Sequence, residues 1–262
     1  MTDILLTNDD GYKSAGFLPL LKELSKEFSV VAVAPDKGRS WIGKAITTKK
    51  ELKLKKIKRE GFDFFLLNGT PADCVQVGLY HVVENRPKLV ASGINIGLNI
   101  GHARILSSGT IGAAMEASID GVKAIASSLA IPLRIKDDTD FYHPKSYVLF
   151  ENAVKITVKV MKKVMGKTFN DVDLFSINIP FDATADSDVE ITEPFKAPYG
   201  QLFHRNGNRL IQRTPPIEFK NMGDSTDLKA LSEGKISVTP ISLTLFSNSS
   251  LKNVERIIKN DW

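Results

Sequence analysis

Through the first 180 residues of the chain, short apolar runs alternate with segments in which apolar residues recur at helical spacing. Ile4 to Thr7 is an apolar run that ends in a polar turn, which is typical of a buried strand. Apolar residues then recur three, four, seven and eleven positions after Phe17, as they do on one face of a helix. Val30 to Ala34 is the next apolar run and stops at Pro35. Strands that are apolar throughout and separated by helices indicate a parallel sheet covered on both faces.

The same alternation predicts the remaining elements of this region. We expect strands at 62–67, 88–92, 124–131 and 174–179, and helices at 71–83, 110–120 and 149–164. A glycine-rich loop is expected directly after the strand at 88–92. The predicted fold class is α/β, with a three-layer, mainly parallel sheet through residue 180.

Beyond residue 180 the pattern changes. Val189 and Ile191 alternate with polar residues, and Asn206-Gly207 separates two apolar pairs, which is a hairpin signal. A short capped helix at 224–232 and a strand at 235–239 are also expected. We interpret residues 1–180 as the core and residues 181–262 as an antiparallel extension that completes the same domain and serves oligomerisation.

Composition places the chain among ordinary globular proteins. Of its 262 residues, 42% are hydrophobic and 25% are charged, which excludes disorder and collagen-like repeats. The sequence shows neither an apolar run of about 18 residues nor a secretory signal pattern, so we expect a cytoplasmic protein without a membrane partner. The single Cys74 excludes an intramolecular disulfide, fits a reducing compartment, and is expected in the core.

The net charge of +5 favours phosphate-bearing ligands but is too diffuse to indicate a nucleic-acid polymer as partner. The lysine-rich run from Lys49 to Arg59 has no interleaved aromatic residues. Because Leu52 and Leu54 alternate with lysines, we interpret it as a solvated hairpin at a sheet edge.

Candidate chemistry gathers where the predicted strands end. Asp9 and Asp10 follow the first strand, and adjacent carboxylates in dry surroundings need a cation or a proton. Hard oxygen ligands suit Mg²⁺ or Mn²⁺. Taken alone, Asn8-Asp9-Asp10-Gly11 fits a turn that caps a helix better than it fits a metal site.

Two further loops add weak signals of the same kind. Ser40 follows the second strand, and Asn95 lies in the glycine-rich stretch before Ser108-Gly109-Thr110 opens a helix. Glycines and a helix N-terminus bring backbone N–H groups close to an oxyanion. At corresponding ends of neighbouring strands, these groups together describe a metal-assisted phosphoryl site.

Several blocks of sequence resemble one family. The segments are ILLTNDDG, VAVAPDKGRS, NGTPADCV, LVASGINIGLNIG, LSSGTIGAAMEA and TDLKALSEGKISVTPIS, in this order from residue 4 to about residue 242. They are similar to the SurE family of stationary-phase survival proteins, which are metal-dependent nucleotidases. The likeness covers nearly the whole chain.

The resemblance implies a set of site residues. One divalent ion per subunit, Mg²⁺ or Mn²⁺, would be held by Asp9, Asp10, Ser40 and Asn95, the two aspartates being the catalytic residues. The substrate phosphate would be held by Asn8, Asn95, Ser108, Gly109 and Thr110.

The resemblance also implies an activity and an assembly. The family hydrolyses nucleoside 5′- and 3′-monophosphates, on a Rossmann-like sheet whose swapped C-terminal hairpin builds dimers and sometimes tetramers. We expect attack by a metal-activated water. An aspartyl-phosphate route ranks lower because Asp9 and Asp10 are adjacent rather than spaced as Asp-x-Asp. The alternative from another class is a nucleotide-binding sensor without turnover.

Two segments depart from the usual family pattern. Trp41-Ile42-Gly43 replaces a Gly-Ala-Thr-like stretch, and His102-Ala103-Arg104 stands where acidic residues often occur. We expect either change to affect which nucleotide the site accepts. Trp41 covers a base or packs at the rim, and the sequence leaves both open. For Glu116, a salt bridge is favoured over a role in bracing the site.

Overall fold

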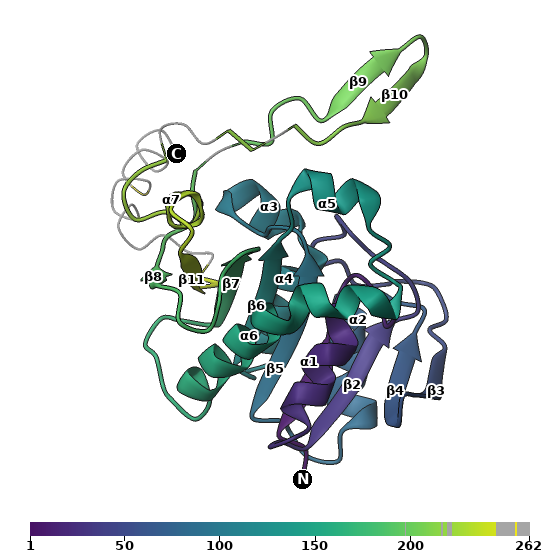
Figure 1. The fold of residues 1–262 in the computed structure, drawn as a ribbon. Helices are drawn as coiled ribbons and strands as arrows, with labels where there is room; N and C mark the ends of the chain where they lie inside the picture. The colour runs from purple at the N-terminus through teal and green to yellow at the C-terminus, as the bar shows by residue number, and fades with distance from the viewer. Residues whose placement is uncertain (197, 216, 219–221, 245–254, 256–262) are drawn as a thin grey trace.

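The described part of the chain forms a nine-stranded sheet with helices on both faces (Figure 1). The computed structural model describes residues 1–196, 198–215, 217–218, 222–244 and 255. The strand order is β3-β4-β2-β1-β5-β6-β7-β11-β8. These strands are β1 (Ile4–Thr7), β2 (Val30–Pro35), β3 (Leu54–Arg59), β4 (Phe62–Leu67), β5 (Leu89–Ile96), β6 (Ala124–Ala130), β7 (Leu174–Pro180), β8 (Val189–Ile191) and β11 (Ile236–Ile241). The α/β class predicted from the sequence is confirmed.

The strand order reverses beside β1. This strand pairs in parallel with β2 on one side and with β5 on the other, so Leu5 lies between Val31 and Val90. From β1 the chain moves outward through β2 and β4, and then returns to start β5 on the opposite side. A crevice opens at the carboxyl ends of strands at such a switch point, and this is where open α/β sheets bind ligands.

Two pairs of helices cover the sheet. In Figure 1, α1 (Phe17–Leu24) and α6 (Glu151–Val164) lie side by side on one face, whereas α2 (Pro71–Val77) and α4 (Gly109–Ile119) lie behind it. The remaining helical segments are the π-helical turn η1 (Gly78–Val82), α3 (Gly101–Ser107), α5 (Leu133–Asp138), the 3-10 helix η2 (Pro144–Phe150) and α7 (Asp227–Ser232). None of the described helices is long and apolar enough to span a membrane.

Each face of the sheet has its own hydrophobic core. Leu20, Leu21 and Leu24 of α1 are buried with the apolar side of α6, as the helical spacing predicts. On the other face, Cys74 and Ile111 are fully buried between α2, α4 and the sheet. Burial raises the pKa of the Cys74 thiol, and its predicted place in the core is confirmed. Each fully buried leucine or isoleucine stabilises the fold by roughly 1.5–3 kcal/mol.

The lysine-rich run forms the predicted edge hairpin. β3 pairs antiparallel with β4 and ends the sheet on that side, with Glu60 and Gly61 between the two strands. Lys56 makes an exposed ion pair with Asp63 at 2.8 Å. Lysine side chains on an edge strand oppose pairing with another sheet, so this run serves solubility.

Several predicted bounds in the core region were wrong. β5 continues to Ile96, where a loop was expected, because its pairing with β6 resumes after an irregularity between Ser92 and Asn95. Helix α3 was not predicted, since it is a short helix inside a glycine-rich stretch. Helix α2 ends at Val77 and gives way to the π-helical turn, and α6 begins at 151 rather than 149.

Part of the region after residue 180 joins the main sheet rather than standing apart. β11 pairs antiparallel with β7 and in parallel with β8. The predicted hairpin is confirmed as β9 (Phe203–Asn206) and β10 (Arg209–Gln212), a separate two-stranded sheet that projects from the body in Figure 1. The extension was predicted to run to residue 262, and its residues 245–254 and 256–262 lie outside the described part.

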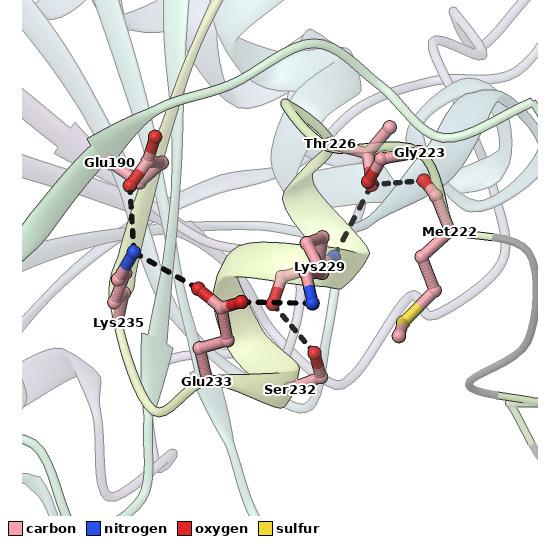
Figure 2. A network of polar contacts seen from close by, with 8 residues as sticks. All are labelled: Glu190, Met222, Gly223, Thr226, Lys229, Ser232, Glu233 and Lys235. Atoms are coloured by element: carbon pink, nitrogen blue, oxygen red, sulfur yellow. Dashed lines mark hydrogen bonds and ion pairs between the residues drawn. The ribbon is translucent and has the colours of Figure 1, made fainter.

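Polar contacts lie at both ends of α7 (Figure 2). The Thr226 hydroxyl accepts a hydrogen bond from the Lys229 N–H at 3.3 Å and so caps the helix. At the other end, Lys235 pairs with Glu233 at 3.0 Å and with Glu190 of β8 at 3.2 Å. These contacts connect the end of α7 to the edge strand.

Candidate active site

A tight turn after β1 presents two adjacent carboxylates. The Asn8 side chain closes this turn, because its Nδ2 donates to the Gly11 carbonyl oxygen at 3.0 Å and its Oδ1 accepts from the Gly11 N–H at 3.2 Å. Gly11 has a φ of 88°, and a Cβ there would lie 3.0 Å from the Lys37 carbonyl carbon. Only glycine meets both conditions without strain. The predicted contact of Asn8 with a phosphate stays a prediction.

Asp9 lies against the N-terminus of α4. Its side chain is buried, and the Thr110 hydroxyl donates to its Oδ1 at 2.6 Å. The helix can approach this closely because residue 109 is glycine: a Cβ at Gly109 would lie 2.8 Å from the Asp9 Cβ. A helix N-terminus stabilises negative charge, so this position suits a carboxylate or a phosphate.

Asp10 is also buried and lies beside the end of β5. Its Oδ2 accepts a hydrogen bond from the Ile96 N–H at 2.9 Å. Burial raises the pKa of Asp10 to about 8, with a smaller contribution from the charge of Asp9, while the Ile96 N–H and Lys136 act in the opposite direction. Burial likewise raises the pKa of Asp9, opposed by the Thr110 hydrogen bond. Both shifts express the cost of keeping two negative charges in a dry place.

The donor set of this turn fits a hard divalent cation. Within the described residues, neither Asp9 nor Asp10 forms an ion pair with a basic side chain. No group of three His, Cys, Asp or Glu gathers anywhere in that part of the chain, so an ion here would complete its shell with neutral oxygens. Carboxylate, hydroxyl and carboxamide oxygens are the ligands that Mg²⁺ and Mn²⁺ prefer.

A cavity of about 830 Å³ opens beside the turn and brings four predicted residues together. Asp9, Ser40, Asn95 and Ser108 line it, although they come from four separate segments of the chain. The Asn95 Nδ2 donates to the Gly97 carbonyl oxygen at 3.0 Å, which orients the side chain. The size suits a nucleotide better than a bare phosphate ion, since small-molecule sites in proteins enclose roughly 300–1,000 Å³.

Four predicted residues, Asn8, Asp10, Gly109 and Thr110, lie behind this lining. Of these four, Thr110 contacts the lining residue Asp9 through the hydrogen bond from its hydroxyl. Ser108, which does line the cavity, caps α4 by accepting from the Ile111 N–H at 3.1 Å. Their predicted contacts with substrate phosphate stay predictions.

Two cationic residues of the cavity wall were not among the predicted site residues. Lys136 of α5 lines the cavity, and its charge favours the ionised form of Asp10. Arg104 of α3 also lines it, is half-buried, and donates to the Pro215 carbonyl oxygen at 3.3 Å. Arg104 had stood out only as a departure from the family pattern. Lys136 carried no signal, because it is one lysine among many in the sequence.

The wall is completed by residues that follow the projecting hairpin. Thr214, Pro215 and Ile217 line the cavity with residues of the core.

Glu116 does not line this cavity. It forms an ion pair with Lys44 and accepts from the Gln76 Nε2 at 2.5 Å, in agreement with the salt bridge favoured from the sequence.

Comparisons with known proteins place the chain in a family. A family model described as "Survival protein SurE" matches residues 4–201. A protein named 5'-nucleotidase SurE from Thermoanaerobacter sp. (strain X514) is 38% identical over 264 aligned positions, covering 99% of this chain and 97% of that protein. Another of the same name, from Methanococcus vannielii, is 37% identical and covers 97% of this chain and 95% of that protein.

Solved structures show the same fold. The crystal structure of the Sure protein from Aquifex aeolicus superposes with a TM-score of 0.80 at 31% identity, over 98% of this chain and 99% of that chain. The family resemblance expected from the sequence blocks is therefore confirmed along nearly the whole length. The chain belongs to the SurE family.

Proposed function

We propose that this protein is a 5'-nucleotidase: a divalent-metal-dependent phosphomonoesterase that hydrolyses nucleoside 5′- and 3′-monophosphates to nucleoside and phosphate. One observation carries the proposal. The buried Asp9–Asp10 pair has no basic side chain in ion-pair contact within the described residues, and it lies beside a nucleotide-sized cavity. A divalent cation would balance these charges and would in turn attract the phosphate of a nucleotide in the cavity. The name shared by the relatives supports the same activity.

In this proposal each residue has a defined part. Asp9, Asp10, Ser40 and Asn95 would hold one Mg²⁺ or Mn²⁺ per subunit. When bound, such an ion polarises a phosphoryl oxygen and lowers the pKa of a coordinated water. The backbone N–H groups at the start of α4, near Ser108 and Thr110, would stabilise the phosphoryl oxygens as charge develops on them.

Water, rather than a carboxylate, is the proposed nucleophile. The Oδ1 of Asp9 already accepts from Thr110 at 2.6 Å, and the Oδ2 of Asp10 accepts from Ile96 at 2.9 Å. Each carboxylate is held in place by one of its oxygens, which suits a ligand more than a nucleophile that must attack in line. Borohydride added during turnover tests this point: recovery of a reduced Asp9 or Asp10 would establish an aspartyl-phosphate route instead.

Phosphate release provides the main test. The protein is stripped with EDTA and assayed on AMP, GMP and adenosine 3′-monophosphate, with and without added Mg²⁺ or Mn²⁺. We expect release only with the metal, and its loss in Asp9→Asn. Asp63→Asn is the matched control, since Asp63 is an exposed acid on the edge hairpin. Nucleotide binding without release in any metal would establish the sensor alternative.

We also propose that the subunits pair as homodimers, with tetramers as a further possible assembly, through the C-terminal extension. The projecting hairpin exposes Phe203, Leu210 and Ile211, which favours contact with another chain. Sedimentation of the full chain and of a Leu210→Asp, Ile211→Asp variant tests this: we expect a dimer or larger assembly for the first and a smaller species for the second.

A further inference from the structure

Trp41 is an aromatic residue in a backbone conformation that disfavours large side chains. Its φ is 62°, in the left-handed region, which glycine occupies freely and bulky residues rarely adopt. It directly follows Ser40, and both residues line the cavity beside Asp9. The residue is 46% exposed although it belongs to a concave wall. A strained backbone that presents an exposed aromatic ring next to a reaction centre calls for a functional explanation.

The ring of Trp41 is held in place from behind. It packs against Tyr199 with ring centroids 5.3 Å apart and planes tilted by 45°. The Tyr199 hydroxyl is in turn hydrogen-bonded to the Ala103 carbonyl oxygen and to the Ser107 hydroxyl. The Gly43 N–H donates to the Ser107 carbonyl oxygen at 2.9 Å, so the Trp41 loop is also fixed to the end of α3.

The rest of the cavity leaves room for a flat group near this ring. Apolar residues form much of its wall, including Ile131, Pro132, Leu133, Pro215 and Ile217. A phosphate ion beside Asp9 would fill only a small part of about 830 Å³. Aromatic rings in such places bind nucleobases by stacking, because every base has a π-face.

We propose that Trp41 is the platform on which the nucleobase of the substrate stacks, so that this chain selects nucleotides over phosphomonoesters without a base. The proposal rests on the proposed function and names the subsite that deepens it. Tyr199 is a positioning residue, because it acts through the Trp41 ring. The stacked base holds the phosphate beside Asp9 and Ser40 without taking part in the cleavage.

Kinetics on a matched pair of substrates test the proposal. AMP and ribose 5-phosphate carry the same phosphate on the same sugar and differ by the base. In Trp41→Gly, which accepts the backbone conformation and should fold, we expect KM for AMP to rise roughly 5- to 150-fold, the range that base–aromatic stacking supports. We expect kcat for AMP and both constants for ribose 5-phosphate to stay close to the wild-type values. Trp41→Phe should restore most of the affinity for AMP.

A second variant tests whether placing glycine at a position of positive φ is enough by itself to change KM. Lys49 also has a positive φ, of 57°, and it is exposed and outside the cavity lining. Lys49→Gly should leave KM for both substrates unchanged.

Fluorescence gives a readout that does not depend on turnover. The sequence has two tryptophans, so Trp262→Phe leaves Trp41 as the only one. In a stopped-flow mixing experiment we expect AMP, but not ribose 5-phosphate, to quench Trp41 before phosphate is released.

The outcomes separate the two proposals. If neither substrate is hydrolysed in any metal, the proposed function is wrong. If both are hydrolysed and Trp41→Gly changes KM for both equally, or for neither, the proposed function stands and the stacking role of Trp41 is overturned. A variant that only changes the oligomeric state would assign Trp41 to a subunit contact and also overturn it.

Discussion

Asp227 and the Asp9–Asp10 pair are all buried carboxylates, but the chain satisfies them to very different extents. Asp227 is fully buried, and its two oxygens accept three backbone hydrogen bonds: from Gly101 at 2.6 Å, Phe195 at 3.0 Å and Leu228 at 2.8 Å. Its carboxylate thus joins the start of α3 to the segment after β8 and to α7. Burial raises the pKa of Asp227, and these three bonds oppose the shift.

Asp10 accepts one hydrogen bond from the described residues, from the Ile96 N–H at 2.9 Å. Asp9 accepts from the Thr110 hydroxyl at 2.6 Å, and the N–H groups of Asp9 and Thr110 also favour its ionised form. Their remaining lone pairs are left for something outside the chain. Burial alone therefore does not distinguish a structural acid from a functional one. For Asp10 and Asp227 the number of hydrogen bonds that the folded chain supplies to the carboxylate does, one against three, because a buried charge with few partners is costly.

The largest effect should follow from Asp10→Asn. The amide oxygen can still accept from Ile96, but the negative charge is lost. If the pair holds a metal, kcat/KM should fall by about a hundred-fold or more, since a bound ion supplies several kcal/mol to the transition state. Thermal unfolding of the metal-free variant should show a higher Tm than the wild type, because the repulsion with Asp9 is gone. Unchanged activity would show that the unsatisfied acid is not functional.

The opposite change of stability is expected for Asp227→Asn. Here Oδ2, which accepts from the Gly101 N–H, becomes an amide nitrogen and leaves that buried donor unpaired. An unsatisfied buried donor costs about 1–3 kcal/mol, and Tm should fall by roughly 2–4 °C per kcal/mol in a chain of this size. Circular dichroism melting measures this. A Tm at or above the wild-type value would contradict the structural role of Asp227.

The pH dependence of stability sharpens the contrast further. The pKa of Asp10 is about 8 in the folded protein and 3.8 in the ordinary, solvated state. Between these values the folded state binds more protons than the unfolded state, so the free energy of unfolding falls as pH rises. Each carboxyl with such a raised pKa lowers the free energy of unfolding by up to about 1.4 kcal/mol per pH unit in this range.

Urea unfolding of the metal-free protein from pH 4 to pH 8 measures that slope. We expect it to be shallower in Asp10→Asn and in wild-type protein with saturating Mg²⁺, since the ion stabilises the ionised pair. An equal slope in all three samples would show that Asp10 is ionised without a ligand.

The smallest effect is expected at an exposed acid. Glu233, at the end of α7, forms ion pairs with Lys229 at 2.9 Å and Lys235 at 3.0 Å, which lower the pKa of its carboxyl (Figure 2). Because water already solvates these charges, Glu233→Gln should leave Tm and phosphate release almost unchanged. A large loss of stability would mean that α7 depends on its surface charges rather than on Asp227.

Much of the fold could be predicted from periodicity. The strands at 62–67 and 174–179 lie close to where the sequence places them, because short runs rich in apolar and aromatic residues between polar turns favour strands. The hairpin at Asn206-Gly207 was also clear, since its turn requires residues that tolerate positive φ. Helix α3 and the end of β5 were missed, because long-range pairing with β6, rather than local sequence, determines where β5 stops.

The site was predictable to a lesser degree. Asp9, Ser40 and Asn95 were identified from the loops that follow strands, and the switch in strand order beside β1 brings them to one cavity. Lys136 carries no local pattern that separates it from the other basic residues of the chain, and Arg104 stood out only as a departure from the family pattern. Their place on the same wall follows from the packing of α3 and α5 over the sheet.

Local sequence was enough to predict most of the strands and longer helices and the loops that carry acids, because periodicity and turn chemistry are properties of neighbouring residues. The tertiary structure was needed to show that Asp9 and Asp10 are buried side by side, that Asp10 has a single hydrogen-bond donor while Asp227 has three, and that Trp41 lines the same cavity as Asp9. Burial and hydrogen-bond supply depend on residues far apart in the sequence, such as Gly101 and Asp227, which are separated by 126 positions, and no local pattern encodes them.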